Sequence, residues 1–339
     1  MKKWVYIYLS IIGFILVLVI SFNFFMDPFW TFSHSHKYNN TQKGTNERQQ
    51  KANYIYFTDK KYDTLLLGSS RTTYMNPYSF LPLKVYNFSA AGMRPKEYLT
   101  YIDFVVEDCK QDIDTIILAV DFFGYLDYGL FMFDNSKSII ANTKTPYYRW
   151  KSLASFDLLN NSFKNLRDYM KQSNYSDRYT RDLVKSYNKR YDLTAHKKQV
   201  EKDVKIYAST EYSGKPSSDY KNIFQSIKNK YHNKKFIIYT TPVSKPLFEE
   251  MIKMGHYNNY KDWLSILVEV FGEINHFMYI NTVSIDYVNN FGDSNHAYPE
   301  TNDIIAKTIL TKYNIIDDFG IKLNNHNIID FINIYDESY

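Results

Sequence analysis

Hydrophobic and polar positions divide the chain into three zones. Residues 4–26 form one uncharged apolar run, "WVYIYLSIIGFILVLVISFNFFM", which is long enough to cross the core of a bilayer as a helix. Residues 27–60 are largely polar, and the stretch "HSHKYNNTQKGTNERQQK" has no periodicity. From residue 63 onward, short apolar runs alternate with segments that carry apolar residues at helical spacing. This last zone predicts strands that alternate with helices.

The alternating zone predicts five strands, in the runs "DTLLLGSS", "KVYNFSAAG", "IDTIILAVDFFGY", "KKFIIYTTPVSK" and "HFMYINT". Helices are predicted over 72–81, 94–109, 261–274 and 300–313. Strands alternating with helices favour an α/β fold, in which helices cover both faces of a central, mostly parallel sheet as a three-layer sandwich. In such sheets the ligand lies beyond the carboxyl ends of the strands.

The alternation weakens between about residues 124 and 234, where Tyr, Asn, Lys, Ser and Asp are frequent. We interpret this segment as an insertion into an α/β domain that spans residues 61–315. Helical stretches are predicted within it at 178–193 and 218–232. The insertion is expected to form a lid or a substrate-binding wall, or else a solvent-facing cap. Residues 316–339 are predicted to be a C-terminal tail.

Charges beside the first apolar run predict its orientation. Lys2 and Lys3 are expected to stay cytoplasmic, which places the rest of the chain outside the membrane. A cleavable signal peptide is the alternative, but its apolar core is usually shorter and small residues should follow it. Here "FNFFMDPFW" follows, which favours an uncleaved transmembrane signal anchor over residues 1–26 and a juxtamembrane connector over 27–60.

Composition excludes several classes of function. The chain has 339 residues with 45% hydrophobic and 23% charged side chains, as in ordinary folded proteins. Its net charge is +5, but the basic residues are dispersed, so nucleic acid is not an expected partner, whereas anionic lipids or anionic wall polymers suit such a surface. The single cysteine, Cys109, excludes an internal disulfide and a zinc site with paired cysteines. No metal site is predicted, since His34 and His36 lie in a polar stretch where solvation is expected.

Three motifs occupy the predicted carboxyl ends of the first three strands: Gly68–Arg71, Ser89–Gly92 and Val120–Phe122. In "LLLGSSRTTY" a strand ends in Gly-x-Ser and leads into a helix. Ser70 is therefore expected at a helix N-terminus, where unpaired N–H groups and the helix dipole favour negative charge. Such a serine is a candidate nucleophile. The alternative is that Ser69 and Ser70 only cap the helix.

Near the C-terminus, the stretch "FGDSNHAYPE" carries Asp293 and His296, directly before the last predicted helix. A serine nucleophile needs a base within hydrogen-bond distance, and the base needs a carboxylate that fixes its tautomer. A short Asp-x-x-His loop can deliver both groups to one point. Ser294 completes a Gly-Asp-Ser tripeptide here, but it is predicted to be a loop residue.

In this order along the chain, the motifs resemble those of the SGNH hydrolase superfamily, also called GDSL esterases. The resemblance covers about residues 61–313, apart from the insertion, and implies an SGNH or flavodoxin-like α/β fold. It implies a catalytic triad in which Ser70 is the nucleophile, His296 the general base and Asp293 the orienting acid. The glycine of "NFSAAG", Gly92, would form the oxyanion hole together with the backbone N–H of Ser70.

The chain departs from the family pattern at two positions. Ser69 replaces the usual aspartate of the first block. The third block normally ends its strand in Gly-x-Asn, whose side chain serves the oxyanion hole, but Asp121 occupies roughly that place and is a poor donor when charged. Asp121 is expected to bind a substrate hydroxyl, to be protonated or to cap the turn. Arg71 and Asn87 are further candidates for substrate binding, and for Arg71 a structural ion pair is the alternative.

These departures resemble membrane-anchored members of the superfamily, the teichoic-acid D-alanylation and alginate O-acetyltransferase families. Both act with a membrane-bound O-acyltransferase partner. The resemblance implies an extracytoplasmic enzyme of the bacterial cell envelope, without a cofactor, that transfers acyl groups to a cell-surface glycopolymer through an acyl-enzyme on Ser70. Two alternatives stay open: an esterase that deacylates such a polymer, and a non-catalytic polymer-binding or assembly partner of the acyltransferase.

Overall fold

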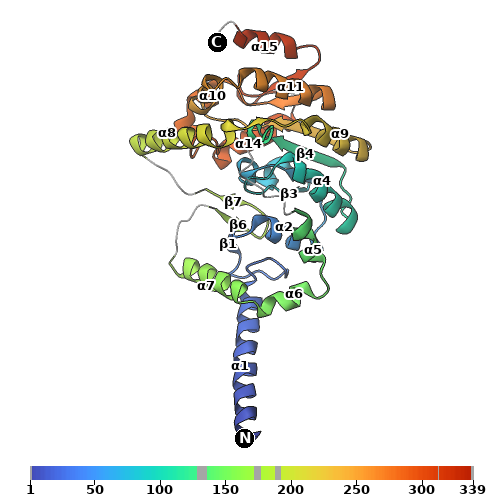
Figure 1. Cartoon of the computed structure of the whole chain (residues 1–339), viewed down its shortest axis with the longest axis vertical. Helices are drawn as coiled ribbons and strands as arrows, with labels where there is room; N and C mark the ends of the chain where they lie inside the picture. The colour runs from blue at the N-terminus through green and yellow to red at the C-terminus, as the bar shows by residue number, and fades with distance from the viewer. Residues whose placement is uncertain (1, 128–135, 172–176, 188–191, 312, 337–339) are drawn as a thin grey trace.

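The computed structural model describes residues 2–127, 136–171, 177–187, 192–311 and 313–336. A six-stranded sheet lies at the centre of the globular part, with helices on both of its faces, and one long helix projects from it (Figure 1). This architecture confirms the predicted α/β class with a central, mostly parallel sheet and an apolar N-terminal helix.

Helix α1, Lys2–Met26, contains the apolar run at the N-terminus. Its segment Lys3–Met26 is long and apolar enough to cross a membrane, and its most apolar part is not buried against the rest of the protein. In Figure 1 it leaves the globular part as a stalk. An exposed apolar helix at this position is consistent with a single membrane anchor or with a signal sequence, the two alternatives that the sequence offers.

The central sheet has the strand order β11-β10-β9-β4-β2-β3. All neighbouring pairs are parallel except β10 and β11, which run antiparallel at one edge. Parallel strands place their carboxyl ends at one edge of the sheet, which is where the three sequence motifs follow β2, β3 and β4. The strands are β2 Thr64–Leu67, β3 Val85–Asn87, β4 Thr115–Val120, β9 Lys235–Thr240, β10 Glu273–His276 and β11 Ile321–Asn324.

Strand β10 lies earlier in the chain than the run "HFMYINT" predicts. Its ladder ends at His276, because the N–H groups of Phe277 and Met278 both donate to the side-chain oxygen of Thr240, at 2.9 and 3.4 Å. The Thr240 side chain of β9 thus replaces the backbone carbonyl that would be the next acceptor for β10. The apolar residues beyond His276 leave the sheet but stay buried.

Strand β4 explains why the sheet needs helices on both faces. All six of its residues are buried. Ile116 and Leu118 belong to one hydrophobic cluster, whereas Ile117 and Ala119, which point to the opposite face, belong to another. The first cluster includes residues of α2 Glu47–Phe57, α4 Pro95–Asp103, α5 Ser136–Lys144, α9 Tyr220–Lys230, α10 Lys245–Lys253, α11 Tyr257–Phe271 and α15 Ile328–Asp336. The second includes residues of the 3₁₀ helix Pro77–Phe80, α12 Thr282–Ile285, α13 Tyr287–Asn290 and α14 Pro299–Leu310.

The predicted helices are present, with local differences. The segment 72–81 forms the end of the short helix α3, Ser70–Thr73, and then the 3₁₀ helix. The segment 94–109 begins as α4 and ends in a π-helical turn, Phe104–Asp108.

The insertion contains helices, but the helix predicted over 178–193 is wrong for the described residues before Leu193. Residues 178–186 form a hairpin, and helical structure begins only at Leu193; residues 188–191 lie outside the described part of the chain, as do 128–135 and 172–176 of the insertion. The hairpin pairs with residues near 41, a partner that no local sequence window can reveal. Besides α5 and α9, the described elements are α6 Tyr148–Lys151, the 3₁₀ helix Ser152–Ala154, α7 Phe156–Met170, β6 Arg178–Thr180, β7 Lys185–Ser186, α8 Leu193–Ser209, the 3₁₀ helix Glu211–Ser213, and β8 Lys215–Pro216, which pairs with β5 Leu126–Asp127.

The segment predicted as a connector is folded into the domain. It forms strand β1, Thr41–Lys43, which pairs with β6, and helix α2, whose N-cap is Asn46. Residues 48–55 of α2 are buried, including Lys51. The segment predicted as a C-terminal tail also differs, because β11 completes the sheet and α15 packs on α11.

Candidate active site

The turn after β2 places Ser69 and Ser70 in different roles. A Cβ atom at Gly68 would lie 2.4 Å from Thr72 Oγ1 and 2.7 Å from Ala119 Cβ, so only glycine allows this close turn between strand and helix. The Ser69 hydroxyl accepts a hydrogen bond from the N–H of Arg71 at 3.3 Å and caps α3. Ser69 is therefore the capping residue, and the side chain of Ser70 is left for another partner.

That partner is His296, more than two hundred residues later in the chain. The Ser70 Oγ and His296 Nε2 atoms lie 2.8 Å apart, and His296 Nδ1 lies 2.7 Å from Asp293 Oδ2. The other carboxylate oxygen of Asp293 accepts hydrogen bonds from the N–H groups of Asn295 and His296, at 2.9 and 2.7 Å. One short loop thus presents both side chains to Ser70, in a serine–imidazole–carboxylate sequence.

Hydrogen bonding keeps Asp293 charged. Partial burial alone would raise the pKa of this carboxyl, but the charge and hydrogen bond of His296, with the two backbone N–H groups, outweigh burial and hold the pKa at about 2. A charged carboxylate at Nδ1 favours the tautomer that has its proton there. Nε2 is then free to accept the Ser70 proton. Both side chains of the loop are 23% exposed, so a small substrate has access to them.

The loops of the first two motifs lie side by side. The N–H of Ala90 donates to the carbonyl of Gly68 at 3.1 Å, which continues the β2–β3 pairing up to the residue before the serines. Gly92 follows in a turn, with a φ of 62° that favours glycine. Within the described part of the chain, no acceptor takes a hydrogen bond from the N–H of Ser70 or of Gly92. Both N–H groups are thus available as the predicted oxyanion donors.

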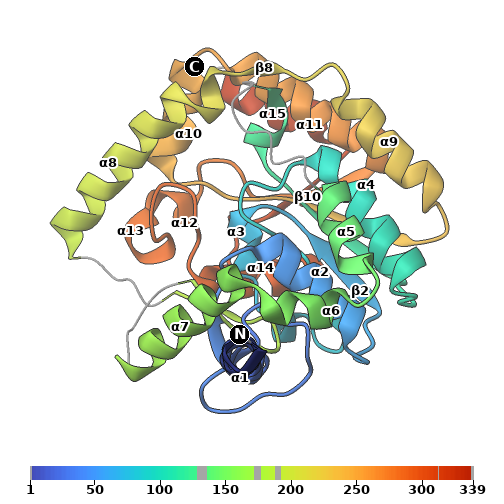
Figure 2. The ribbon, with the colours of Figure 1, turned by 60° about the horizontal axis from the view of Figure 1, so that its bottom comes forward.

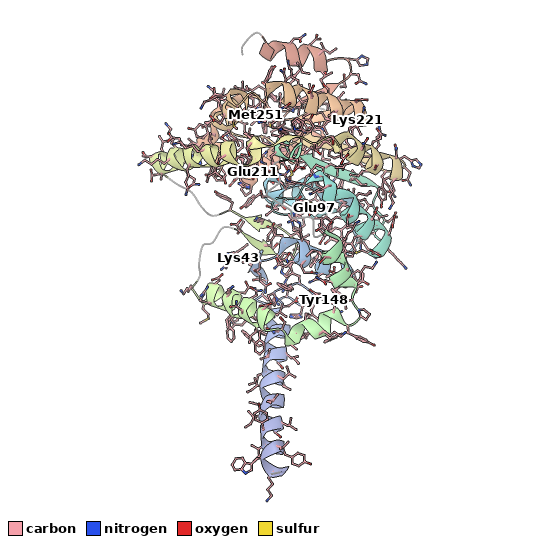
Figure 3. All side chains as sticks on the ribbon, in the orientation of Figure 1. Lys43, Glu97, Tyr148, Glu211, Lys221 and Met251 are labelled. Carbon is pink, nitrogen blue, oxygen red and sulfur yellow. The ribbon has the colours of Figure 1, made fainter. Side chains whose placement is uncertain are left out.

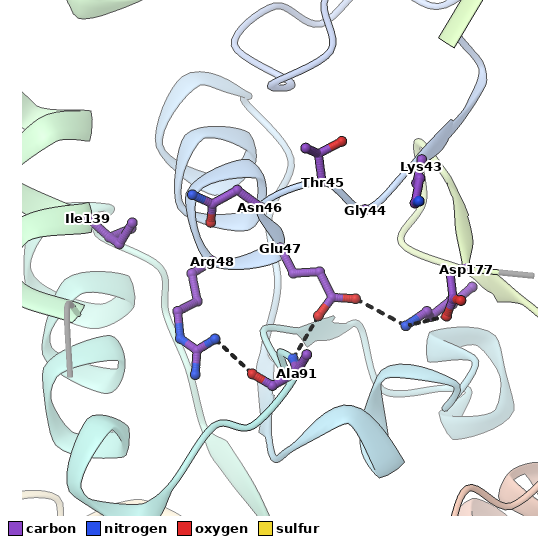
Figure 4. Close-up of a pocket in the computed structure, with 10 residues that line it drawn as sticks. Lys43, Gly44, Thr45, Asn46, Glu47, Arg48, Ala91, Ile139 and Asp177 are labelled. Carbon is purple, nitrogen blue, oxygen red and sulfur yellow. Dashed lines mark hydrogen bonds and ion pairs between the residues drawn. The ribbon is translucent and has the colours of Figure 1, made fainter. Parts of the chain in front are cut away.

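Helix α2 holds both peptide groups of Ala91, the residue before Gly92 (Figure 4). The N–H of Ala91 donates to Glu47 Oε2 at 2.7 Å, and Arg48 Nη1 donates to the Ala91 carbonyl at 2.8 Å. Arg48 is itself fixed by two hydrogen bonds to Glu97, at 2.7 and 2.9 Å. The sequence pattern did not predict a role for these residues, because their segment is polar and was predicted to be a connector. Asn46 followed by Gln49 is a helix-start signal that could have revealed α2.

A charge cluster, buried at Glu47 and Lys185 and half-exposed at Asp177, connects α2 to the helix that carries Ser70. Lys185 Nζ lies 3.1 Å from Glu47 Oε1, 3.2 Å from Asp177 Oδ1 and 3.1 Å from Thr73 Oγ1 of α3. Burial would raise the pKa of Glu47, but Lys185 and the neighbouring Lys51 lower it to about 2. The cluster borders a pocket of about 490 Å³ that is lined by Lys43, Gly44, Thr45, Asn46, Glu47, Arg48, Ala91, Ile139, Asp177 and Lys185 (Figure 4).

Lys51 lies in the same buried region as this cluster. Its ammonium group donates to the carbonyl of Ser89 at 2.6 Å, and burial lowers the pKa of Lys51 to about 7. Ser89 opens the second motif, so three side chains of α2, those of Glu47, Arg48 and Lys51, bind the loop that leads to Gly92.

Arg71 and Asp121, two predicted substrate-binding residues, form an ion pair. Both are almost fully buried, with Arg71 Nη1 3.3 Å from Asp121 Oδ1. Thr241 bridges them, since it accepts from Arg71 Nη1 at 3.1 Å and donates to Asp121. The Arg71 guanidinium also lies over the rings of Phe123 and Tyr207. Its Nη2 atom is buried and makes no hydrogen bond of normal geometry among the described residues, and the hydroxyls of Tyr207 and Tyr212 lie close to the guanidinium.

Asn87, the third candidate for substrate binding, is used inside the fold. Its amide nitrogen donates to the carbonyls of Thr72 and Met75, at 3.0 and 3.1 Å, and its oxygen accepts from the N–H of Ser89 at 3.1 Å. The side chain is fully buried. These contacts tie the end of α3 to β3 and occupy both amide protons, so Asn87 is not retained as a substrate-binding residue.

Helix α8 of the insertion lies against the site. Tyr207 covers the guanidinium of Arg71, and the His196 Nε2 atom lies 2.8 Å from the carbonyl of Phe291. Phe291 forms a bridge with Ala297 that closes the loop of Asp293 and His296. The insertion is therefore part of the wall around the triad.

Two further residues, Ser294 and Cys109, take no part in the triad. The Ser294 side chain is buried, and its Oγ accepts from the amide of Asn295 at 3.3 Å. Burial raises the pKa of the Cys109 thiol to about 12, which disfavours the reactive thiolate.

Within the described residues, no cluster of three or more His, Cys, Asp or Glu side chains lies close enough to hold a metal ion.

Comparisons with known proteins give a distant structural likeness. No protein-family model matches the chain, and no curated protein sequence matches it. A solved structure described as "The structure of a putative platelet activating factor from Streptococcus pneumonia" has a TM-score of 0.35 and 9% sequence identity, with 78% of this chain and 90% of that chain covered. A likeness of this size supports no statement about activity.

Proposed function

We propose that the protein is an extracytoplasmic serine O-acyltransferase that modifies a cell-surface glycopolymer through an acyl-enzyme on Ser70. The observation that carries the chemistry is the hydrogen-bonded chain from Ser70 through His296 to Asp293, with distances of 2.8 and 2.7 Å. A hydroxyl, an imidazole and a carboxylate in this order are the groups that activate a serine for acyl transfer.

In the first half-reaction, Ser70 Oγ attacks the carbonyl carbon of an acyl donor while His296 Nε2 takes the hydroxyl proton. The bond to the leaving oxygen breaks as His296 returns that proton to it. In the second half-reaction, His296 deprotonates an acceptor hydroxyl, which attacks the Ser70 ester, and Ser70 regains its proton. Asp293 stabilises the imidazolium form in both halves.

Negative charge on the carbonyl oxygen would be stabilised by the N–H groups of Ser70 and Gly92. In the SGNH superfamily, which the chain resembles, an asparagine side chain also donates to the oxyanion. Arg71 is our candidate for that role. It follows the nucleophile directly in the chain, it is buried, and its Nη2 makes no hydrogen bond of normal geometry among the described residues. Asp121 offsets its charge, so Arg71 would act on the oxyanion as part of a fixed dipole rather than as a bare cation.

The acceptor decides between transfer and hydrolysis. A sugar or polyol hydroxyl gives an acylated polymer, and water gives an esterase. We favour transfer because α1 is exposed and apolar, which suits a chain held beside a membrane-bound O-acyltransferase that supplies the acyl group. The polymer and the membrane partner are carried over from the family resemblance.

A second candidate is a non-catalytic polymer-binding or assembly protein. Asp121, at the place of a family donor, favours it, whereas the spacing of Ser70, His296 and Asp293 favours the enzyme. A serine-directed fluorophosphonate probe, applied to the purified full chain, separates the two. We expect labelling of the wild type and of Ser294→Ala, but not of Ser70→Ala. A folded wild-type chain that takes up no label would contradict the enzymatic proposal.

A further inference from the structure

Helix α7 exposes apolar side chains and buries polar ones. Phe156, Phe163 and Met170 are 79%, 57% and 69% exposed. The side chains that α7 buries against the protein are Leu158, Asn161, Ser162, Asn165 and Asp168. A helix that faces water normally exposes polar side chains and buries apolar ones. The exposed face of α7 is therefore suited to an apolar environment rather than to water.

The three exposed apolar residues form one stripe. They are seven residues apart, and such a repeat drifts only about 20° around a helix per heptad. The ring of Phe163 contacts the ring of Phe22 in α1, with centroids 4.8 Å apart. The stripe therefore lies next to the end of α1, at the level where that helix joins the globular part (Figure 1).

Polar contacts hold α7 in this orientation. Ser162 Oγ donates to Asn23 Oδ1 in α1 at 2.9 Å, and the Asn23 amide donates to the carbonyl of Leu153 at 2.8 Å. Farther along the helix, Asp168 pairs with Arg178 of β6 at 3.6 Å. Turning the apolar stripe inward would break these buried contacts, so the outward position of the stripe is fixed by the fold.

The segment around α6 extends the same surface on the other side of α1. Tyr147 and Trp150 are mostly exposed. Figure 2, turned to bring the α1 end forward, shows α6 and α7 on either side of α1, and Figure 3 labels Tyr148 at the same level. The segment 147–171 carries five basic side chains, Arg149, Lys151, Lys164, Arg167 and Lys171, against two acidic ones, Asp157 and Asp168.

We propose that α6 and α7 form a membrane-contact collar, which we define as Tyr147, Trp150, Phe156, Phe163 and Met170, and which lies in the headgroup region of the bilayer that α1 enters. Exposed aromatic side chains beside an apolar helix, flanked by basic ones, are the composition of a membrane interface with anionic lipids. The collar would hold the domain at a fixed height and orientation over the lipid surface.

The bilayer is favoured as the occupant because the collar is continuous with α1. The proposal rests on α1 being retained as an anchor, and it is independent of the chemistry proposed for Ser70. Triad variants leave it untouched, and collar variants leave the triad in place, so the two proposals fail separately.

Collision measurements on spin labels test the collar in the full chain. In a Cys109→Ser background, single nitroxide labels are placed at Phe156→Cys, Phe163→Cys and Met170→Cys, and the chain is reconstituted into phosphatidylcholine vesicles with about one third phosphatidylglycerol. Ile329→Cys in α15, an exposed apolar residue at the opposite end from α1, is the matched control. We expect the α7 labels to collide more with oxygen than with a water-soluble nickel complex, and the Ile329 label to do the reverse.

Two results would overturn the collar. One is equal nickel access for the α7 and Ile329 labels in vesicles. The other is α7 labels that are shielded in native membranes but open to nickel in pure lipid, which would indicate a membrane protein as the occupant. Because Phe163 touches α1, the labels at Phe156 and Met170 keep the test valid if the Phe163 variant folds poorly.

Discussion

The Oγ atom of Ser70 lies 2.8 Å from Nε2 of His296, although 226 positions separate the two residues in the chain. Ser70 opens α3 after the second strand, and His296 ends a loop that precedes the last long helix of the domain. The relationship exists because β2 and the loop before α14 meet at one edge of the sheet. It supports a chemical role for both side chains.

Replacing the orienting carboxylate tests that role. Asp293→Asn keeps the shape of the side chain but favours the other tautomer of His296, whose Nε2 would then carry the proton. We expect turnover of an activated ester such as p-nitrophenyl acetate to fall by about 10³- to 10⁴-fold, with the fold intact by circular dichroism. Because the pKa of Asp293 is about 2, its titration adds nothing to the pH dependence of the wild type above about pH 4. Wild-type turnover of the Asp293→Asn variant would contradict the proposed catalytic triad.

The buried ion pair of Arg71 and Asp121 is expected to be costly to break. Arg71→Met leaves the Asp121 carboxylate buried without its cation, which should destabilise the protein by about 3–5 kcal/mol in urea unfolding. Asp121→Asn in addition should recover part of that loss. The control is Lys221→Met, which removes an exposed pair with Glu269 and should cost about 1 kcal/mol or less. Equal costs for the two single variants would show that the Arg71 pair is not desolvated.

The contacts of α2 with Ala91 predict a positioning role for Glu47. In Glu47→Ala the Ala91 N–H loses its acceptor, so the Ala90–Ala91 peptide is no longer fixed and the adjoining Gly92 N–H can shift. We expect kcat on an acyl ester to fall by about 10- to 100-fold with little change in KM, less than the loss of a whole oxyanion donor.

Two variants control this prediction. Glu47→Gln keeps an oxygen that can accept from Ala91 and should recover part of the activity, and Lys43→Ala on the same pocket wall should behave as wild type. A purely structural role for Glu47 would lower stability in both Glu47 variants without the selective change in kcat.

His276 predicts acid sensitivity of the fold. It is fully buried, with Nδ1 2.8 Å from Thr240 Oγ1 and Nε2 2.6 Å from the Tyr260 hydroxyl, and burial lowers its pKa to about 3. The unfolded chain binds a proton near pH 6.5, and the folded chain does so only near pH 3. Between these values the unfolded state holds more protons, so stability falls as the pH falls, by up to about 1.4 kcal/mol per pH unit.

Urea unfolding between pH 7 and pH 4 measures this effect. His276→Gln, which cannot take up the proton, should show a flatter decline than the wild type over the same window. Identical slopes for the two proteins would mean that His276 does not contribute. The comparison between variant and wild type removes the contribution of the carboxyl groups, which they share.

Local sequence patterns predicted those strands and helices whose apolar residues follow a regular pattern within the element itself. The alternation of apolar strands with helices was enough for the α/β class, because strands such as β4 are buried on both faces and therefore consist of apolar residues. The pattern failed where long-range partners decide the conformation. The segment 178–186 contains a helix-like run but forms a hairpin, since β1 offers its backbone to β6.

The same division holds at the site. The order of Gly-x-Ser, a small-residue turn and Asp-x-x-His singled out Ser70, Gly92, Asp293 and His296 from the chain alone, because close turns and short loops leave a local signature. The sequence could not separate the roles of Arg71, Asn87 and Asp121. All three are polar residues close to strand ends. Arg71 and Asp121 meet at Thr241, which lies far from both in the chain, whereas Asn87 binds the carbonyls of Thr72 and Met75.

The sequence by itself determined the class of fold, the apolar N-terminal helix and the residues that meet at the edge of the sheet, since these depend on burial and on short-range turns. Only the tertiary structure decided that α2 belongs to the domain and grips the loop before Gly92, and that α7 turns its aromatic side outward beside α1. Both outcomes depend on which surfaces meet in three dimensions, because a side chain is buried or exposed through neighbours that the local pattern does not contain.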